Sequence, residues 1–334
     1  MGEPAEQQQL DAARHGDAAA FRTLTERHRR ELVVHCYRFV GNLEDAEDLV
    51  QEVFLRAWQR LASFEGRSSL RTWLYRIATN ASLDAIDRRP PRILPHDAGP
   101  PAPPQAPLRG PALELPWLGP IPSALLVDCA VATDVAYTMR ESVSLAFLAA
   151  LQRLPARQRA AVILFDVIGW QVEEVAELLE LSAAAVQSLL ARARGSLKKG
   201  YARAPALPSD EERALLDRYV RAWELGDVAG LVALMREDAT MAMPPLPSWY
   251  LGRVAIADFV RASIFVGPGA GVKIRPTEAN GAPALAFYRR SSDGEAWSFL
   301  GVQLVELMGA EIAGVVTYVG EPYAERFGLS PALA

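Results

Sequence analysis

Cysteine, histidine and long apolar runs are scarce in this chain of 334 residues, and each scarcity narrows the class of protein. The only cysteines, Cys36 and Cys129, are too few for a disulfide framework and indicate reduced thiols in a cytoplasmic protein. No apolar run approaches the roughly 20 residues that cross a bilayer, so we expect no membrane association. The polar N-terminus, MGEPAEQQQLDAARHGD, does not have the pattern of a secretion signal.

The charge is distributed unevenly along the chain. A net charge of −5 argues at first sight against a nucleic-acid partner. Residues 150–203, however, carry 8 basic against 5 acidic side chains, whereas residues 204–334 carry 11 against 16. Because phosphates respond to a local patch rather than to the total charge, residues 150–203 remain a candidate for contact with DNA.

The sequence predicts a multidomain protein with four segments: helical residues 8–89, a linker at 90–123, helical residues 124–203, and an α+β unit at 209–329. The linker holds half of the 24 prolines, which lack an amide donor and disfavour helix in the preceding residue. We therefore expect it to be extended and partly mobile, except at residues 115–120, which are apolar enough to dock.

The last segment changes from helical to strand patterns. Helices are expected at about 210–225, 228–236 and 253–264, with a short strand before the third. Strands follow at 272–279, 283–290, 296–307 and 311–319, with turn signals at Asn280-Gly281, Asp293-Gly294 and Gly309-Ala310. Three helices followed by an antiparallel meander define an α+β fold.

Residues 172–199 predict two short helices of opposite charge. Apolar positions recur every three or four residues in each half, and the break Glu180-Leu181-Ser182 separates an acidic helix from a basic one. Ser182 is a suitable N-cap for the second helix, which in a helix-turn-helix enters the major groove. Taken alone, the stretch also fits a plain helical hairpin.

Three blocks of sequence resemble, in order, parts of bacterial sigma factors. DAEDLVQEVFLRAW (45–58) resembles the polymerase-docking helix, and RTWLYRIATNASLDAIDRR (71–89) resembles the helix that recognises and melts the promoter minus-ten element. LPARQRAAVILFDVIGWQVEEVAELLELSAAAVQSLLARAR (154–194) resembles the minus-thirty-five-binding domain. This order, without an intermediate domain, is that of extracytoplasmic-function sigma factors. The resemblance implies two all-α sigma domains, the second with a helix-turn-helix, that bind promoter DNA and the β′ clamp and β flap of the RNA polymerase core.

The docking helix has an acidic edge and outward apolar side chains, which suit a basic, amphipathic partner helix; a merely solvated acidic face is the alternative. With Leu49 taken as exposed, the residues expected to bind polymerase are Asp45, Asp48, Leu49, Gln51, Glu52 and Leu55.

The resemblance also implies that residues 64–69 take a base flipped out of the melted strand. Extrusion costs a few kcal/mol, which stacking of about 1–3 kcal/mol per base must offset. The helix that follows would read upstream bases and contact phosphates, whereas Trp73, Leu74, Tyr75 and Ile77 are expected in the core. The expected minus-ten contacts are Phe64, Arg67, Ser68, Arg71, Arg76, Asn80, Asp84 and Arg88.

The expected minus-thirty-five contacts are Ser182, Ala184, Ala185, Gln187, Ser188, Arg192, Arg194 and Lys198, with Lys199 as a further phosphate contact. The family often has glycine where Glu180 stands, and a more polar pair where Leu189 and Leu190 stand, so no minus-thirty-five sequence is predicted. The first 90 residues carry 13 basic against 14 acidic side chains, so the free protein should bind DNA weakly and require polymerase for specific binding.

The C-terminal segment resembles SnoaL-like domains, cones of the nuclear-transport-factor-two-like fold, through LLDRYVRAWELGDVAGLVALMREDATMAMPP (215–245). Residues 117–120 resemble, more loosely, a linker motif of sigma factors fused to such domains. Such cones have a mostly apolar pocket that could take a small molecule, and some relatives are enzymes. Here the four histidines, His15, His28, His35 and His96, all lie outside the cone.

Acid–base chemistry in the cone would need a positioned group with a tuned pKa. The candidates, Asp238, Asp258, Glu278, Tyr250, Tyr288 and Tyr318, have no distinctive spacing. We therefore expect no catalysis and no cofactor, and interpret the cone as a built-in regulator that grips the linker or the sigma domains. The alternative is a bifunctional protein whose cone transforms a small molecule. An ordinary dimeric repressor would not need the docking helix or the melting loop.

Overall fold

The computed structural model describes residues 3–126, 139, 141–200, 210–266, 271–290 and 296–333. The chain divides into two compact units: unit 1 comprises Met1–Arg92 and Ala124–Arg203, and unit 2 comprises Ile93–Ser123 and Ala204–Ala334. Both predicted sigma domains thus belong to unit 1, and the linker belongs with the C-terminal segment. Cys129, the Asp293-Gly294 turn and the side chain of Lys199 lie outside the described residues.

The first part of unit 1 is helical, as predicted. Its elements are α1 (Glu3–Arg14), α2 (Ala18–Glu26), α3 (Arg29–Val40), α4 (Leu43–Arg60), the short η1 (Leu61–Ser63) and α5 (Leu70–Arg88). Asn42 caps α4 by accepting from the Asp45 amide, and Ser69 caps α5 by accepting from the Thr72 amide. Leu74, Tyr75 and Ile77 are buried, which confirms their assignment to the core.

The second part of unit 1 contains the predicted helix-turn-helix. Its elements are η4 (Glu141–Val143), α6 (Leu145–Gln152), α7 (Ala156–Ala161), a π-helical turn η5 (Val162–Val167), α8 (Val172–Leu179) and α9 (Ala183–Gly200). Pro155 precedes α7, and Gly169 has a φ of 83°, which ends the helical run before α8. Val175 and Leu179 of α8 and Val186 of α9 are buried and hold the pair together.

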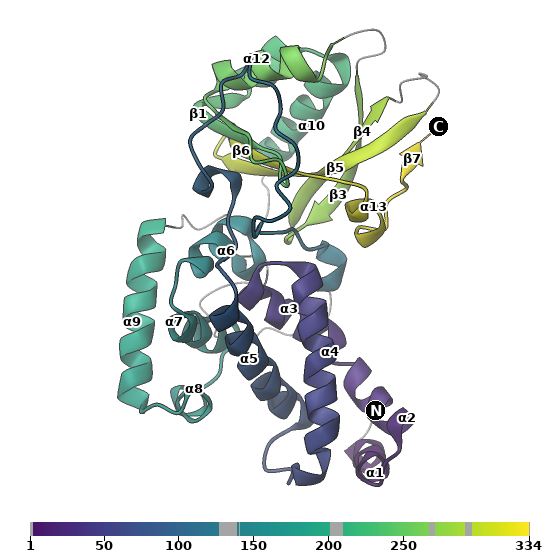
Figure 1. Cartoon of the computed structure of the whole chain (residues 1–334), viewed down its shortest axis with the longest axis vertical. Helices are drawn as coiled ribbons and strands as arrows, with labels where there is room; N and C mark the ends of the chain where they lie inside the picture. The colour runs from purple at the N-terminus through teal and green to yellow at the C-terminus, as the bar shows by residue number, and fades with distance from the viewer. Residues whose placement is uncertain are drawn as a thin grey trace. The chain divides into compact units, whose positions relative to one another are not determined.

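Unit 2 is an α+β fold built on one sheet (Figure 1). Its elements are α10 (Asp210–Leu225), α11 (Val228–Ala233), β1 (Met235–Ala242), β2 (Trp249–Leu251), α12 (Arg253–Ser263), β3 (Val272–Ala279), β4 (Ala282–Arg290), β5 (Trp297–Met308), β6 (Glu311–Val319), α13 (Pro322–Arg326) and β7 (Ala332–Leu333). The strand order is β2-β1-β6-β5-β4-β3, with β7 beside β5. The meander β3–β6 is antiparallel, as predicted. The sheet is mixed because β1 joins β6 in parallel, and α11 ends at Ala233 because β1 begins two residues later.

The two faces of this sheet carry separate cores. Side chains alternate between faces along a strand, so Leu285 and Phe287 of β4 pack with α10 and α12, whereas Ala286 and Tyr288 pack with Ala324 of α13. Figure 1 shows α10 and α12 over one face of the sheet.

The linker follows a defined course over unit 2, unlike the partly mobile segment expected from its prolines. Its amides find acceptors at two places in the C-terminal segment: Ala102 donates to the carbonyl of Trp249 at 2.7 Å, and Ala112 donates to that of Pro245 at 2.9 Å. Leu118 is completely buried and Trp117 is 9% exposed, with the indole donating to the Ala112 carbonyl at 2.8 Å. The prediction that residues 115–120 dock is confirmed.

The end of the linker is held by the β3–β4 turn. Asn280 is 3% exposed and has a φ of 54°, the left-handed conformation that asparagine tolerates. Its side-chain oxygen accepts from the Ile121 amide at 3.1 Å, and its own amide donates to the Ile121 carbonyl at 2.8 Å. The Gly281 amide donates to the Ser123 hydroxyl at 3.0 Å. We call Ile121, Ser123, Asn280 and Gly281 the linker clamp.

Candidate functional site

One side of α4 presents acidic and apolar side chains to solvent. Asp48, Gln51 and Glu52 are exposed, and 57% of the surface of Leu55 is accessible. The core of this region is filled from the opposite side of the helix, where Val53 is completely buried. Leu55 is therefore not needed for folding, and the surface has the character of a docking face for a basic amphipathic helix.

Two residues predicted on this docking face are placed differently. Leu49 is only 7% exposed, so the prediction that it faces outward was wrong: it lies one turn before Val53 and shares its buried side. Asp45 is half-buried, and its carboxylate pairs with Arg89 at 2.6 Å and with Arg92. Asp45 therefore holds the end of α5 to the start of α4.

The loop between η1 and α5 is anchored by its aromatic residue. Phe64 is 6% exposed, its ring lies 4.9 Å from that of Trp73, and its carbonyl accepts from Arg14. Phe64 therefore fixes the loop, and its burial does not fit the prediction that it contacts a base. Arg67 is exposed and pairs with Glu65, two residues before it, at 3.0 Å, so it stays on the outward side of the loop.

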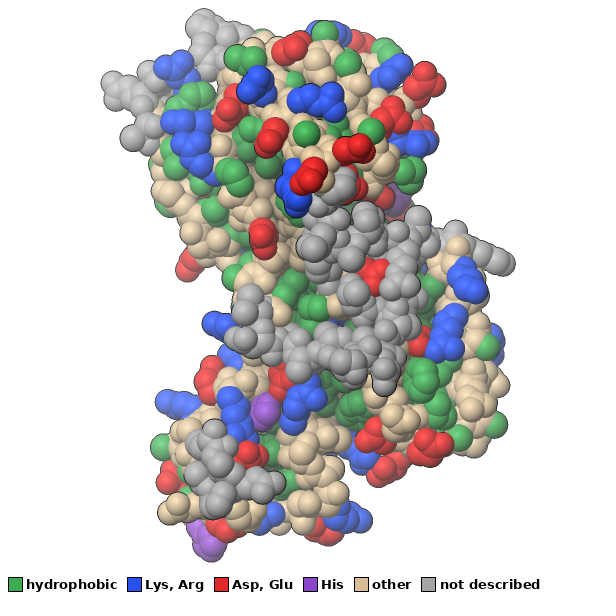
Figure 2. All heavy atoms as spheres, turned by 180° about the vertical axis from the view of Figure 1, so that it is seen from behind, with side chains coloured by type: hydrophobic (Ala, Val, Ile, Leu, Met, Phe, Trp, Pro, Cys, Tyr) green, Lys and Arg blue, Asp and Glu red, His purple; other side chains and the backbone are tan. Residues whose placement is uncertain are grey.

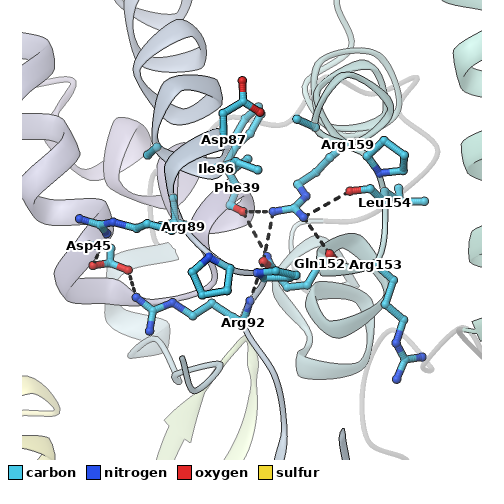
Figure 3. Close-up of a pocket in the computed structure, with 16 residues that line it drawn as sticks. Phe39, Asp45, Ile86, Asp87, Arg89, Arg92, Gln152, Arg153, Leu154 and Arg159 are labelled. Atoms are coloured by element: carbon cyan, nitrogen blue, oxygen red, sulfur yellow. Dashed lines mark hydrogen bonds and ion pairs between the residues drawn. The ribbon is translucent and has the colours of Figure 1, made fainter. Parts of the chain in front are cut away.

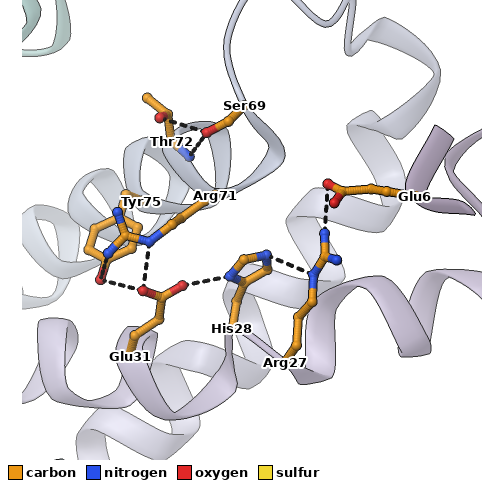
Figure 4. A network of polar contacts seen from close by, with 8 residues as sticks. All are labelled: Glu6, Arg27, His28, Glu31, Ser69, Arg71, Thr72 and Tyr75. Carbon is orange, nitrogen blue, oxygen red and sulfur yellow. Dashed lines mark hydrogen bonds and ion pairs between the residues drawn. The ribbon is translucent and has the colours of Figure 1, made fainter. Parts of the chain in front are cut away.

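Arg71 belongs to a network of polar contacts within the first helical region (Figure 4). Its Nε donates to Glu31 at 2.7 Å, and its guanidinium lies 4.8 Å from the centre of the Tyr75 ring. His28 Nδ1 lies 2.6 Å from the same carboxylate. Burial opposes ionisation of Glu31, but hydrogen bonds from His28 and Arg71 outweigh it, so the pKa of Glu31 is lowered. Arg71 thus joins α3 to α5, which does not fit a role as a phosphate contact.

Arg76, a predicted minus-ten contact, forms an ion pair with a residue of the second sigma domain. Its two terminal nitrogens lie 2.8 and 2.7 Å from the two carboxylate oxygens of Glu177 in α8. These hydrogen bonds raise the pKa of Arg76 and lower that of Glu177. The Glu177 carboxylate therefore makes with Arg76 the bidentate contact that a DNA phosphate would make in the predicted complex.

The remaining predicted residues of α5 stay on its surface. Asn80, Asp84 and Arg88 follow at intervals of four, and all three are exposed. Asp84 lies 3.2 Å from Arg56 of α4. On the outward face of α5, the Asn80 amide lies one turn before Asp84 and the Arg88 guanidinium one turn after it.

The helix-turn-helix separates charge as its sequence predicts. Ser182 caps α9 by accepting from the Ala185 amide at 3.2 Å. Figure 2 shows blue side chains on the α9 part of unit 1 and a red group on the α8 part. On α9, the side chains of Ala184, Gln187, Ser188, Arg192 and Lys198 are exposed, and Ala185 is half-buried.

Arg194 is exposed, with 45% of its side-chain surface accessible, but it is paired within unit 1. It donates to Asp166 at 3.0 Å through Nε, and its guanidinium lies over the Phe165 ring at 5.6 Å. The Asp166 side chain is 1% exposed, and a buried carboxylate requires a cation. The prediction that Arg194 contacts phosphate does not fit this ion pair, whereas Arg192 and Lys198 are also exposed on α9.

Glu180 adopts the conformation that glycine usually supplies at this turn. Its φ and ψ are 54° and 48°, and Leu181 closes the turn by donating to the Ala176 carbonyl at 2.9 Å. This is a Schellman C-cap, in which a residue with a Cβ is strained. The turn geometry is therefore kept although the residue departs from the family pattern.

Glu180→Gly is expected to stabilise the helix-turn-helix by about 1 kcal/mol because it removes that strain. Amide hydrogen exchange in α9 should slow about fivefold. Glu173→Gly, in the first turn of α8, the helix that Glu180 caps, is the matched control and should accelerate exchange. Faster exchange in the Glu180 variant would contradict the strain argument.

Within unit 1, one backbone carbonyl accepts two of the hydrogen bonds that join the sigma domains (Figure 3). Phe39 O, at the end of α3, accepts from Arg159 at 2.6 Å and from Gln152 Nε2 at 3.1 Å. Both donors are buried, at 2% and 4% exposure. Arg38 adds hydrogen bonds to the Ser142 hydroxyl at 3.2 and 3.0 Å. We call the Phe39, Gln152 and Arg159 group the carbonyl hub.

Inside the cone of unit 2, three buried polar side chains bond to one another. Tyr219 donates to Gln303 Oε1 at 2.8 Å, and Gln303 Nε2 donates to Thr317 at 2.8 Å. Burial raises the pKa of Tyr219, which keeps the phenol protonated. Asp238 and Asp258, two of the three carboxylates considered for catalysis, pair on the surface with Arg236 and Arg261.

Sequence reasoning missed several residues that organise these surfaces. Gln152 and Arg159 lie in predicted helices, but nothing in their spacing identifies a common acceptor in a helix more than a hundred residues earlier. Likewise, no pattern in the sequence around Glu31 predicts its contact with Arg71. Asn280 had a local signal, because Asn-Gly predicts a turn, but not its contact with the linker.

The helical unit with its docking face and helix-turn-helix, followed by an α+β cone, defines the class of a sigma factor with a C-terminal extension. Family models agree: Sigma-70 region 2 matches residues 24–90, Sigma-70 region 4 matches residues 144–197, and a SnoaL-like domain matches residues 216–315.

Individual relatives identify the family. The ECF RNA polymerase sigma factor SigG of Mycobacterium tuberculosis is 39% identical over 324 residues, covering 96% of this chain and 86% of that protein. SigW of Bacillus subtilis is 27% identical over 192 residues, 57% of this chain and 93% of that protein. The chain belongs to the extracytoplasmic-function sigma factors, the subunits that direct RNA polymerase to promoters.

A solved structure shares the whole architecture. The crystal structure of the extracytoplasmic-function sigma factor SigJ of Mycobacterium tuberculosis matches with a TM-score of 0.63 at 20% identity, covering 92% of this chain and 99% of that one. The expected fold class, helical sigma domains followed by a SnoaL-like domain, is confirmed. In the described part of the chain, every helix is too short or too polar to traverse a bilayer.

Proposed function

We propose that unit 1 binds the RNA polymerase core through the docking face of α4 and promoter DNA through α5 and α9, and that unit 2 regulates it by holding the linker. The observation that carries the regulatory part is the linker clamp. In it, Asn280 and Gly281 are hydrogen bonded to Ile121 and Ser123, the last linker residues before the second sigma domain. A linker held in this way limits how far apart in space the two sigma domains can lie, because less of the connecting chain is free to extend.

The polymerase contacts follow from exposure and charge. Asp48, Gln51, Glu52 and Leu55 form a docking face for the β′ clamp, and α9 and its flank are the surface for the β flap and the minus-thirty-five element. Because polymerase acts on the chromosome, the cytoplasm is the proposed location.

The packing inside unit 1 favours an inhibitory role for the held form. The Glu177 carboxylate occupies Arg76, and the carbonyl hub joins the two sigma domains. Promoter binding requires Arg76 to exchange the carboxylate for a phosphate, so the packed arrangement is the resting form. Any factor that favours this arrangement lowers the population that is competent for transcription.

A regulatory rather than catalytic cone is supported by how its polar groups are used. Tyr219, Gln303 and Thr317 form a closed hydrogen-bonded chain in the interior. In the described part of unit 2 the one buried carboxylate is Glu212, 8% exposed in the first turn of α10, and the cores on the two faces of the sheet are formed by apolar and aromatic side chains. A ligand of this cone would therefore act by changing the populations of conformers.

The test compares the full chain with a variant lacking residues 205–334 in transcription with purified core polymerase. We expect transcription to rise, because the released linker lets the sigma domains take the spacing that polymerase imposes. The double variant Asn280→Gly, Ser123→Ala should change transcription in the same direction, by about tenfold for two lost hydrogen bonds. Glycine keeps the positive φ of the turn, so only the clamp contacts are removed.

Tyr288→Phe is the matched control, because it removes a hydrogen bond to the Ser330 carbonyl in unit 2 without touching the linker. A fall in transcription on truncation would make the cone an activator. Unchanged transcription in both variants would eliminate regulation by the cone.

A further inference from the structure

One outward stripe of α9 carries few groups that can read a base. The exposed residues that recur there at intervals of three and four are Ala184, Gln187, Ser188 and Ala191, which we call the reading stripe. The two alanines offer only methyl groups. The Ser188 hydroxyl donates its one hydrogen to the Ala184 carbonyl at 3.0 Å, so it remains an acceptor only. Gln187 is therefore the side chain of this stripe that offers a donor and an acceptor together.

The two leucines that replace the more polar pair of the family lie beside the reading stripe rather than in it. Leu190 is 3% exposed, and Leu189 is half-buried. Both belong to the side of α9 that packs against its own domain. The departure from the family pattern therefore leaves the hydrogen-bonding groups of the reading stripe unchanged.

The amide of Gln187 has room to reach a base. On a helix, a long side chain points back over the residues three and four positions before it, which here are Ala184 and Ala183. Their methyl groups are too small to cover the amide, and among the described residues none is hydrogen bonded to it. This direction is toward the N-terminal end of α9, the end whose residues meet base edges in a helix-turn-helix.

The cations of α9 stand further along the helix. Arginine is the side chain that pairs with O6 and N7 of guanine, but the first arginine of α9 is Arg192, in its second half. The Arg192 Nε donates to the Ser188 carbonyl at 3.2 Å, which holds the guanidinium along the helix. We therefore assign Arg192 and Lys198 to phosphates, and base recognition by the reading stripe to Gln187.

We propose that Gln187 reads an adenine of the minus-thirty-five element, its amide oxygen accepting from the adenine N6 amino group and its amide nitrogen donating to N7. The major-groove edge of adenine presents one donor beside one acceptor, whereas that of guanine presents two acceptors. A single amide therefore favours adenine by about tenfold. This inference rests on the proposed function, because it requires α9 to lie in the major groove of the promoter.

The test is selection of bound fragments from a DNA library with a randomised promoter region, by holoenzyme assembled from purified core polymerase and the full chain. The wild type should select one A·T pair, with adenine favoured about tenfold on one strand. Gln187→Ala should lose this preference and keep those at other positions. Gln187→Glu should favour cytosine at the same position, because a carboxylate only accepts hydrogen bonds and the cytosine amino group donates one. Glutamine, alanine and glutamate all favour helix, so α9 is kept.

Lys198→Gln is the matched control, since Lys198 is exposed on the same helix outside the reading stripe. Loss of a phosphate contact should weaken binding to every sequence and leave base preferences unchanged. Base preferences that are the same in Gln187→Ala as in the wild type would overturn this inference while promoter recognition stands. A wild-type holoenzyme that selects no sequence would overturn the proposed function and this inference together.

Discussion

Replacing Leu55 by aspartate is expected to weaken binding to the RNA polymerase core by about 100-fold while leaving the fold unchanged. Leu55 has 57% of its surface accessible, so the free protein gains nothing from burying it. In the complex, the side chain would fill an apolar site surrounded by charge, where a carboxylate is both desolvated and misplaced. About 3 kcal/mol is typical of a central interface contact and corresponds to this loss.

The measurement is a titration of labelled core polymerase with each variant, with circular dichroism to confirm the helices. Leu225→Asp is the matched control, since Leu225 is 74% exposed at the end of α10 in unit 2. Asp48→Ala and Glu52→Ala should have smaller effects that diminish with salt, because exposed charges are screened. Core affinity that is equal in the Leu55 and Leu225 variants would remove α4 from the polymerase interface.

Replacing Gln152 by methionine is expected to shift unit 1 about 30-fold toward separated sigma domains and to raise transcription. Methionine keeps the length of the side chain but loses three contacts: the donation to Phe39 O at 3.1 Å, and the acceptance from Arg159 at 3.1 Å and from the Arg92 amide at 3.3 Å. Buried hydrogen bonds that include a charged partner contribute about 2 kcal/mol when one side is removed.

Energy transfer between dyes at Arg67→Cys and Ser196→Cys, both exposed positions of unit 1, reports the separation. Cys36 will not be labelled because it is buried and burial raises the pKa of its thiol to about 12, and Cys129 is replaced by serine. Gln158→Met in α7 is the matched control, since Gln158 is half-buried and outside the carbonyl hub. Energy transfer and transcription that do not respond to Gln152→Met would contradict the view that the hub closes the resting form.

The positions of the elements followed from local signals. Asn42, Ser69 and Ser182 each cap the helix that their side chains predict, because a cap depends only on the three residues that follow it. The strands β3 to β6 of unit 2 agree with their predicted β-rich runs to within a residue or two, because those runs and the turn residues between them are also local signals. Leu55 on the surface of α4 was anticipated from periodicity, but Leu49 was misassigned because a helix with a wide apolar stripe leaves its edge ambiguous.

The pairing of charges was beyond sequence reasoning. Arg71, Arg76 and Arg194 were all predicted to contact DNA, yet each has a carboxylate partner on another helix. An arginine on a helix surface has the same local sequence whether its partner is a phosphate or a distant glutamate. Only the packing of α3, α5, α8 and α9 decides between them.

The sequence by itself determined the family, the order of the domains and the docking and recognition helices, because those properties reside in contiguous motifs and their periodicity. The tertiary structure alone decided that the linker belongs to the cone and that the two sigma domains meet at the carbonyl of Phe39. These features arise from hydrogen bonds between residues up to 159 positions apart, such as that between Ile121 and Asn280, and no local pattern encodes a partner at that distance.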